Sequence, residues 1–275
     1  MEDLAAEKIR SWNILNRAGR SQLRSDPVFL AKVIKCVDHS ELISLGIDDQ
    51  YLINIAASSS GDFSQAGSQI IIEDVPTILT PSKAQLLEDE IFDVLSSFGD
   101  FLGNNSPATY GNLYEKVIEP LRGPLFSNRK GAVGILKFLQ DPIAGIQGKD
   151  LLFEIPAPHA RGTTSRIDVS VNNNRYEIKN CAACITPTTI KEQFIERDLF
   201  NASSVNDITK WKIYEQGYTQ TQLISHLTSN KDAIENLGVE RISQILDEDI
   251  SDLTISQASD LLITFISDNY PIIFE

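Results

Sequence analysis

The clearest regular pattern in the chain is an alternation of apolar and polar residues near its centre. Residues 166–171 (RIDVSV) alternate strictly, and residues 175–180 (RYEIKN) alternate again. Period-two alternation is typical of β-strands that bury one face. The three asparagines at 172–174 tolerate the positive φ angles of tight turns. The sequence therefore predicts a β-hairpin here.

The apolar faces of the two strands indicate a register for this hairpin. They match when Val169 lies opposite Ile178 across a two-residue loop at 173–174, because directly opposed residues on antiparallel strands share a face. This register sets Asp168 opposite Lys179, and a slip by one residue would bury charge. The polar face then gathers three charged residues: Asp168, Glu177 and Lys179.

Helical spacing of apolar residues predicts helices on both sides of the hairpin. Before it, the expected elements are helices over 83–98, 106–120 and 133–139 and a strand over 151–155. Ser106 and Pro107 suit the N-cap and first position of the second helix. Pro156 and Pro158 are expected to end the strand. After the hairpin, helices are expected over 219–227, 232–246 and 256–265.

Net charge separates the chain into three parts. The 275 residues carry 24 Lys and Arg against 38 Asp and Glu, a net charge of −14, which taken whole argues against binding to nucleic acid. Residues 101–216 nevertheless hold 14 basic and 12 acidic side chains, a net charge of +2, whereas each flanking segment carries −8. We therefore expect an acidic, mainly helical segment over 1–100, a domain over 101–216 and an acidic helical segment over 217–275.

Composition and the cysteine count exclude several classes of protein. A hydrophobic content of 42% with 23% charged residues is typical of a globular chain rather than a disordered one. No apolar run approaches the ~20 residues of a membrane span, and the acidic start lacks the layout of a signal peptide, so we expect a cytoplasmic protein. Three cysteines are too few for a disulfide scaffold. We interpret Cys181 and Cys184 as buried free thiols or, joined by Cys36 and His39, as a zinc site.

Two carboxylates and an ammonium group on one strand face have two interpretations. Carboxylate oxygens bind hard divalent cations such as Mg²⁺, and a bound metal can activate water and stabilise a phosphate under attack. A lysine beside it can neutralise the developing charge. The other interpretation is an exposed strand face with a simple cross-strand ion pair, worth less than ~1 kcal/mol.

The order of these residues resembles the PD-(D/E)xK nuclease superfamily, which has the restriction-endonuclease-like fold. That family places an Asp on one strand and Glu-x-Lys on the partner strand of a hairpin, as Asp168 and then Glu177 and Lys179 do here. The usual proline before the first Asp is absent, since Ile167 stands there. The resemblance covers about residues 107–215. Within the family, the sequences of both strands look most like those of toxin and effector nucleases.

Two further positions match the family pattern. It includes an acidic residue in an earlier helix, for which Glu115 is the best match and Glu119 one turn later the competitor. It often includes a glutamine in the helix after the hairpin, which Gln193 matches. The resemblance therefore implies a catalytic set that is listed here in full: Glu115, Asp168, Glu177, Lys179 and Gln193.

The resemblance also implies a fold, a cofactor and partners. The fold would be α/β, with a mixed sheet of about four strands flanked by helices. The cofactor would be Mg²⁺ or Mn²⁺, held by Asp168 and Glu177 with help from Glu115. The substrate would be DNA, or RNA as for some members. A toxin, effector or defence role would imply an immunity or inhibitor protein as partner. It would also imply that the protein is translocated into the cytoplasm in which it acts.

Residues beside the hairpin extend these expectations. Arg161, Arg166 and Arg175 could contact phosphates or could be ordinary solubilising charges. His159 could donate a proton to a leaving group, although an exposed loop histidine is the plainer interpretation. The alternative to a nuclease is a catalytically silent nucleic-acid-binding or protein-interaction module with the same fold. In that case the acidic helical flanks would bind the partner.

Overall fold

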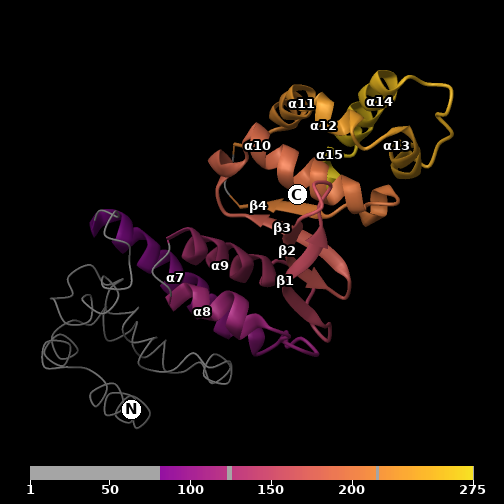
Figure 1. Cartoon of the computed structure of the whole chain (residues 1–275). Coiled ribbons are helices and arrows are strands. Elements are labelled where there is room, and N and C mark those ends of the chain that lie inside the picture. The colour runs from indigo at the N-terminus through magenta and orange to yellow at the C-terminus, as the bar shows by residue number, and fades with distance from the viewer. Residues whose placement is uncertain (1–80, 123–125, 215–216, 275) are drawn as a thin grey trace, which may run out of the picture. The chain divides into compact units, whose positions relative to one another are not determined.

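The computed structural model describes residues 81–122, 126–214 and 217–274 (Figure 1). It divides into two compact units, and the chain passes from the first to the second between Lys149 and Asp150. This division falls inside the segment 101–216 that charge alone delimits. Most of the helical segment expected over 1–100, together with Cys36 and His39, lies outside the described residues. Within the described ranges, no helix is long and apolar enough to span a bilayer.

The described part of the first unit is helical. Its elements are α7 (Pro81–Leu102), the π-helical η1 (Tyr114–Ile118), α8 (Glu119–Arg122) and α9 (Phe126–Leu139). The expected helices over 83–98 and 133–139 are confirmed and are longer than expected. The expected helix start at Ser106 is wrong, because the Ser106 hydroxyl donates to the Leu102 carbonyl at 3.1 Å and so caps the end of α7 instead. Pro120 does not end the second helix, since the helical run continues through it from η1 to Arg122 at the end of α8.

The second unit is built on a four-stranded sheet. Its strands are β1 (Leu151–Pro158), β2 (Thr164–Val171), β3 (Asn174–Lys179) and β4 (Lys210–Ile213), in the order β1-β2-β3-β4. β1, β2 and β3 are antiparallel neighbours, and β4 runs parallel to β3. This mixed sheet with helices confirms the α/β class. β1 continues through both prolines that were expected to end it, because an edge strand can leave the N–H side of a residue unpaired.

Helices fill the rest of the second unit. They are η2 (Ala182–Cys184), α10 (Pro187–Thr189), η3 (Ile190–Leu199), η4 (Val205–Asp207), α11 (Gln220–Ser229), α12 (Lys231–Glu235), α13 (Val239–Leu246), α14 (Ile255–Asp268) and α15 (Tyr270–Ile273). Thr219 and Thr254 each close a capping box at the start of α11 and α14. The single helix expected over 232–246 is wrong, since Gly238 at φ 83° breaks it into α12 and α13.

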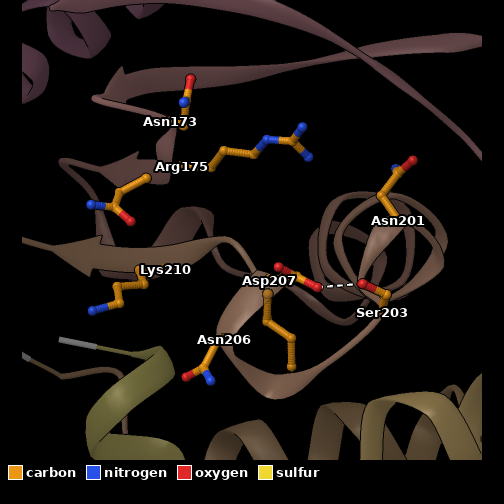
Figure 2. A pocket seen from close by; sticks show the side chains of 9 residues that line it. Asn173, Arg175, Asn201, Ser203, Asn206, Asp207 and Lys210 are labelled. Atoms are coloured by element: carbon orange, nitrogen blue, oxygen red, sulfur yellow. Dashed lines mark hydrogen bonds between the residues drawn. The ribbon is translucent and has the colours of Figure 1, made fainter.

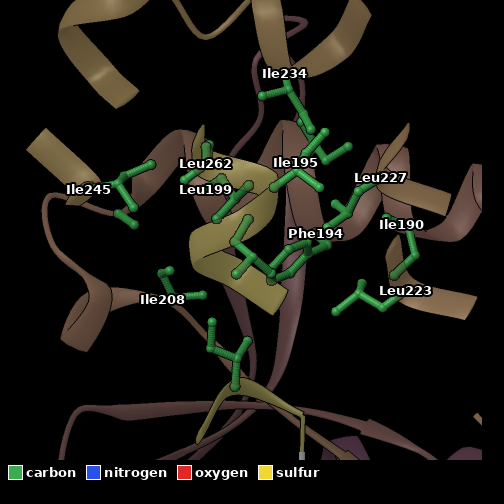
Figure 3. Packing of buried hydrophobic residues seen from close by; sticks show 14 of the residues in the cluster. Ile190, Phe194, Ile195, Leu199, Ile208, Leu223, Leu227, Ile234, Ile245 and Leu262 are labelled. Atoms are coloured by element: carbon green, nitrogen blue, oxygen red, sulfur yellow. The ribbon is translucent and has the colours of Figure 1, made fainter. Parts of the chain in front are cut away.

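The helix η3 lies at the centre of the apolar core of this unit (Figure 3). Phe194, Ile195 and Leu199 are fully buried, and side chains from α11 to α14 pack around them. The rings of Phe194 and of Trp211 on β4 meet in a T-shaped arrangement, with 6.0 Å between their centroids. One face of the sheet is therefore joined to η3 and, through η3, to the C-terminal helices. This core continues across the boundary expected at 216–217.

Candidate active site on the β2–β3 hairpin

The β2–β3 hairpin exists as expected, but its register differs by two residues. The turn consists of Asn172 and Asn173, whose φ angles of 47° and 71° fit a type I′ turn. Val169 lies opposite Tyr176, not opposite Ile178 as the apolar pattern suggested. A shift of two residues returns every side chain to its original face. The expected sharing of one face is therefore preserved, although the expected pairs are wrong.

The corrected register brings Asp168 level with Glu177. The Ile178 N–H donates a hydrogen bond to Asp168 Oδ2 at 2.7 Å, which links the two strands at this point. Lys179 lies two residues further along β3 on the same face, and its Nζ is 2.5 Å from Glu177 Oε1. The structure thus brings three of the predicted site residues together. They are not on an exposed face, since Glu177 is only 2% exposed.

Two buried residues of η3 complete a charged network around Glu177. Arg197 donates from Nη2 to Glu177 Oε2 at 2.9 Å and from Nε to Asp198 Oδ1 at 2.7 Å. Asp198 also accepts a hydrogen bond from the Trp211 indole N–H at 2.8 Å. Lys179 Nζ lies 5.3 Å from the centre of the Trp211 ring, a cation–π distance. The carboxylate of Glu177 therefore pairs with two cations, and the network continues into the core.

Burial dominates the protonation equilibria of this network. Burial, and then the charge of Glu177, raise the pKa of Asp168 to about 7. Burial by itself would lower the pKa of Lys179, but the carboxylates of Glu177 and Asp168 raise it on balance. With Asp168 protonated, the carboxylates of Glu177 and Asp198 balance the two cations. With Asp168 ionised, the network carries one net negative charge, which an added cation would stabilise.

The other two predicted catalytic residues lie on helices and not on the hairpin. Gln193 lies on η3, one turn before Arg197, and its buried Oε1 has no hydrogen-bond partner in the described part of the chain. Glu115 lies on η1 in the first unit, where it is exposed and pairs with Lys116. The assistance that the resemblance implies from Glu115 stays a prediction.

The three predicted phosphate-binding arginines have different surroundings. Arg161 pairs with Glu196 at 2.7 Å, and Arg166 pairs with Glu154 at 3.4 Å. Arg175 is exposed and lies on the same face of β3 as Glu177 and Lys179, since the three alternate along the strand.

Arg175 borders a polar pocket of about 350 Å³ (Figure 2). The other lining residues are Asn173, Asn174, Asn201, Ser203, Asn206, Asp207, Ile208 and Lys210. The Asp207 carboxylate accepts a hydrogen bond from the Ser203 hydroxyl, which is the leading reason why the pKa of Asp207 is lowered. The pocket thus combines two cations, a carboxylate held ionised and several amides, a lining suited to a polar, charged ligand.

Two expectations about reactive side chains are wrong. His159 is 9% exposed rather than a solvated loop residue, with its Nε2 lying 3.0 Å from the Glu192 carbonyl oxygen. Cys181 and Cys184 are neither free thiols nor zinc ligands but form a disulfide, with their Cα atoms 5.4 Å apart. Two cysteines three residues apart can close a local loop even where the chain has too few for a scaffold.

Arg197 and Asp198 are not among the residues that the sequence pattern predicts for the site. A signal for them does exist in the sequence. Adjacent opposite charges follow Phe194 and Ile195 and precede Leu199, so a turn of this apolar helix carries an Arg-Asp pair. Charged residues are almost never fully buried unless they are paired, and such a pair within a buried helix indicates an internal salt bridge.

Comparison with known proteins adds no relative to this description. No family model, no curated protein and no solved structure matches the chain.

Proposed function

We propose that the second unit is a metal-dependent nuclease that hydrolyses phosphodiester bonds, mainly in DNA. The single observation that carries this proposal is the convergence of Asp168, Glu177 and Lys179 on one face of the β2–β3 hairpin. The same residue types in the same order form the signature of the PD-(D/E)xK superfamily, which the sequence resembles. The mixed four-stranded sheet is compatible with that resemblance.

The donor set suits a hard divalent cation such as Mg²⁺ or Mn²⁺. Mg²⁺ is commonly held by one or two carboxylates and keeps several of its waters, so Asp168 and Glu177 would be its protein ligands. The described residues contain no cluster of three or more His, Cys, Asp or Glu side chains placed to hold a metal, and a two-carboxylate Mg²⁺ site does not require one. The net negative charge of the network with Asp168 ionised favours a bound cation.

The residues of the chain would divide the work of hydrolysis. A bound cation would supply an activated water and stabilise charge on the phosphate. Lys179 stays protonated at neutral pH because nearby carboxylates raise its pKa, so it would stabilise negative charge rather than accept a proton. The Oε1 of Gln193, which has no hydrogen-bond partner among the described residues, can accept a hydrogen bond from water. At the polar pocket, Arg175 and Lys210 would bind a neighbouring phosphate of the nucleic-acid strand.

One observation favours a second function. The carboxylate of Glu177 is already satisfied by Lys179 and Arg197 without a metal. A network closed on itself in this way also suits a catalytically silent module, in which buried ion pairs hold the hairpin against η3. Such a module would bind nucleic acid or a protein partner without cutting. The two functions differ in whether the protein, with Mg²⁺ and Lys179, cleaves a phosphodiester bond or only binds its partner.

Cleavage assays on the full chain separate the two functions. Plasmid DNA and a structured RNA are incubated with the wild type, Lys179→Ala and Lys191→Ala, each with Mg²⁺ and with EDTA. Lys191 is the matched control because it also lies in the second unit but forms only a partly exposed pair with Asp232 at 3.6 Å. We expect Mg²⁺-dependent cutting by the wild type and Lys191→Ala, and loss of cutting in Lys179→Ala. A folded wild type that cuts no nucleic acid would support the silent module.

A further inference from the structure

The connection from β3 to the central helix is closed by a disulfide. Cys181 follows Lys179 by two residues, and Cys184 lies just before the helical run of α10 and η3. The segment between them is the single 3₁₀ turn η2, which ends with the Ile185 N–H donating to the Ala182 carbonyl. The bond therefore lies between the strand that carries Glu177 and the helix that carries Arg197.

We propose that Cys181 and Cys184 form a reversible thiol–disulfide modification site whose state is transmitted to the charged network of the hairpin. Cys184 is exposed and Cys181 partly buried, so an external thiol can reach the bond. A disulfide that closes a loop this short contributes less to stability through chain entropy than one that closes a long loop. A purely structural role therefore explains the bond poorly. A role in thiol exchange explains both the exposure of Cys184 and the short spacing of the two cysteines.

The exchange reaction balances with a dithiol as the reductant. One thiolate of the dithiol attacks the Sγ of the exposed Cys184, and Cys181 leaves as a thiolate. The second thiol of the reductant then resolves the mixed disulfide, so the reductant is oxidised to a cyclic disulfide. The protein gains two electrons and two protons and holds two free thiols. Any dithiol or protein of the CxxC class can serve, and the reverse exchange restores the bond.

Hydrogen bonds on both sides of the bond provide the route of transmission. On the helix side, the Thr189 hydroxyl donates to the Cys184 carbonyl at 2.8 Å, and the Thr189 N–H donates to Thr186 Oγ1 at 3.1 Å. On the strand side, the Lys179 carbonyl accepts from the Tyr214 N–H at 2.9 Å. Opening the bond frees the turn between these anchors. The start of η3 can then move relative to the end of β3, where Lys179 lies above Trp211.

Trp211 provides a readout of this coupling that does not depend on nuclease activity. The chain has two tryptophans, so a Trp12→Phe background leaves Trp211 as the only tryptophan, which is excited selectively over the tyrosines. Cys36→Ser in the same background leaves only the two cysteines of the bond. This background chain is equilibrated with dithiol buffers of graded reducing power. Free thiols are counted by alkylation and mass measurement, and Trp211 emission is recorded on the same samples.

We expect no free thiol in the oxidised chain, two after reduction, and the loss of both on reoxidation. The emission of Trp211 should change in step with the thiol count. The matched control carries both Cys181→Ser and Cys184→Ser. Its Trp211 emission should equal that of the reduced chain and should not change with the reductant. Free thiols that never pair, a bond that resists dithiol while the chain stays folded, or identical Trp211 emission in both states would each overturn the proposal. A chain that cuts no nucleic acid would leave these readouts intact.

Discussion

Replacing Asp168 with Asn is expected to stabilise the second unit and to remove the proposed activity. Asn has nearly the same shape as Asp, and its amide oxygen can still accept the hydrogen bond that Ile178 N–H donates at 2.7 Å. The substitution therefore removes mainly the charge. That charge is unfavourable in the free protein, because burial and the neighbouring Glu177 both oppose it.

The magnitude follows from the pKa of Asp168, which is raised from 3.8 to about 7. An acid with a raised pKa in the folded state binds more protons when folded, so stability falls as pH rises between about 4 and about 7. The full difference corresponds to a ceiling of about 4 kcal/mol, at about 1.4 kcal/mol for each pKa unit. Asp168 is only partly buried, so we expect Asp168→Asn to gain about 1–2 kcal/mol above pH 7.

Equilibrium unfolding in urea with EDTA measures this gain. In the Trp12→Phe background, Trp211 reports on the second unit, and the free energy of unfolding is compared at about pH 5 and about pH 8. Asp232→Asn is the matched control, since its exposed carboxylate should change stability little. The gain from Asp168→Asn should be larger at the higher pH. An Asn variant no more stable than its parent at about pH 8 would refute the electrostatic reasoning.

Three further substitutions test the network, the core and the turn. Arg197→Met should cost about 3–5 kcal/mol, because it removes the cation of buried Asp198 and one of the two cations that pair with Glu177. Arg161→Ala at the surface should cost less than about 1 kcal/mol, and equal costs in urea unfolding would contradict this. Phe194→Ala should cost about 3–5 kcal/mol by opening a cavity in the core, and a loss below about 1 kcal/mol in the same assay would be inconsistent with the packing. Asn173→Val should cost about 1–2 kcal/mol at a φ of 71° while Asn173→Gly is nearly neutral, and thermal melts that rank the two variants in the opposite order would exclude the type I′ turn.

The hairpin shows how much of a structure a hydrophobic pattern can predict. Alternation predicted both strands and the face that Asp168, Glu177 and Lys179 share. It could not select the register, because shifts of two residues keep every side chain on its face and Val169 fits either Tyr176 or Ile178. The turn residues could not resolve this either, since three consecutive asparagines offer two equivalent loops. Only the paired backbones distinguish between them.

Local backbone turns and tertiary packing determine the features that the sequence did not predict. Ser106 and Pro107 have the chemistry of a helix start, but the Ser106 hydroxyl donates to the Leu102 carbonyl at the end of α7. The burial of Arg197 and Asp198 depends on the packing of η3 over the sheet, which local periodicity does not describe. The bond between Cys181 and Cys184 depends on the turn that brings them together. In each case a partner distant in sequence or a particular backbone turn decides the outcome.

The central claim is that phosphodiester bonds are hydrolysed at the site formed by Asp168 and Glu177. The most direct measurement is the rate at which the full chain cuts a supercoiled plasmid at saturating Mg²⁺, compared between the wild type and Asp168→Asn. A loss caused by unfolding is excluded if the variant is the more stable protein, as expected above. We predict that cutting falls by about 100-fold or more in Asp168→Asn. Equal rates in the two proteins, or no cutting by the folded wild type, would contradict the account.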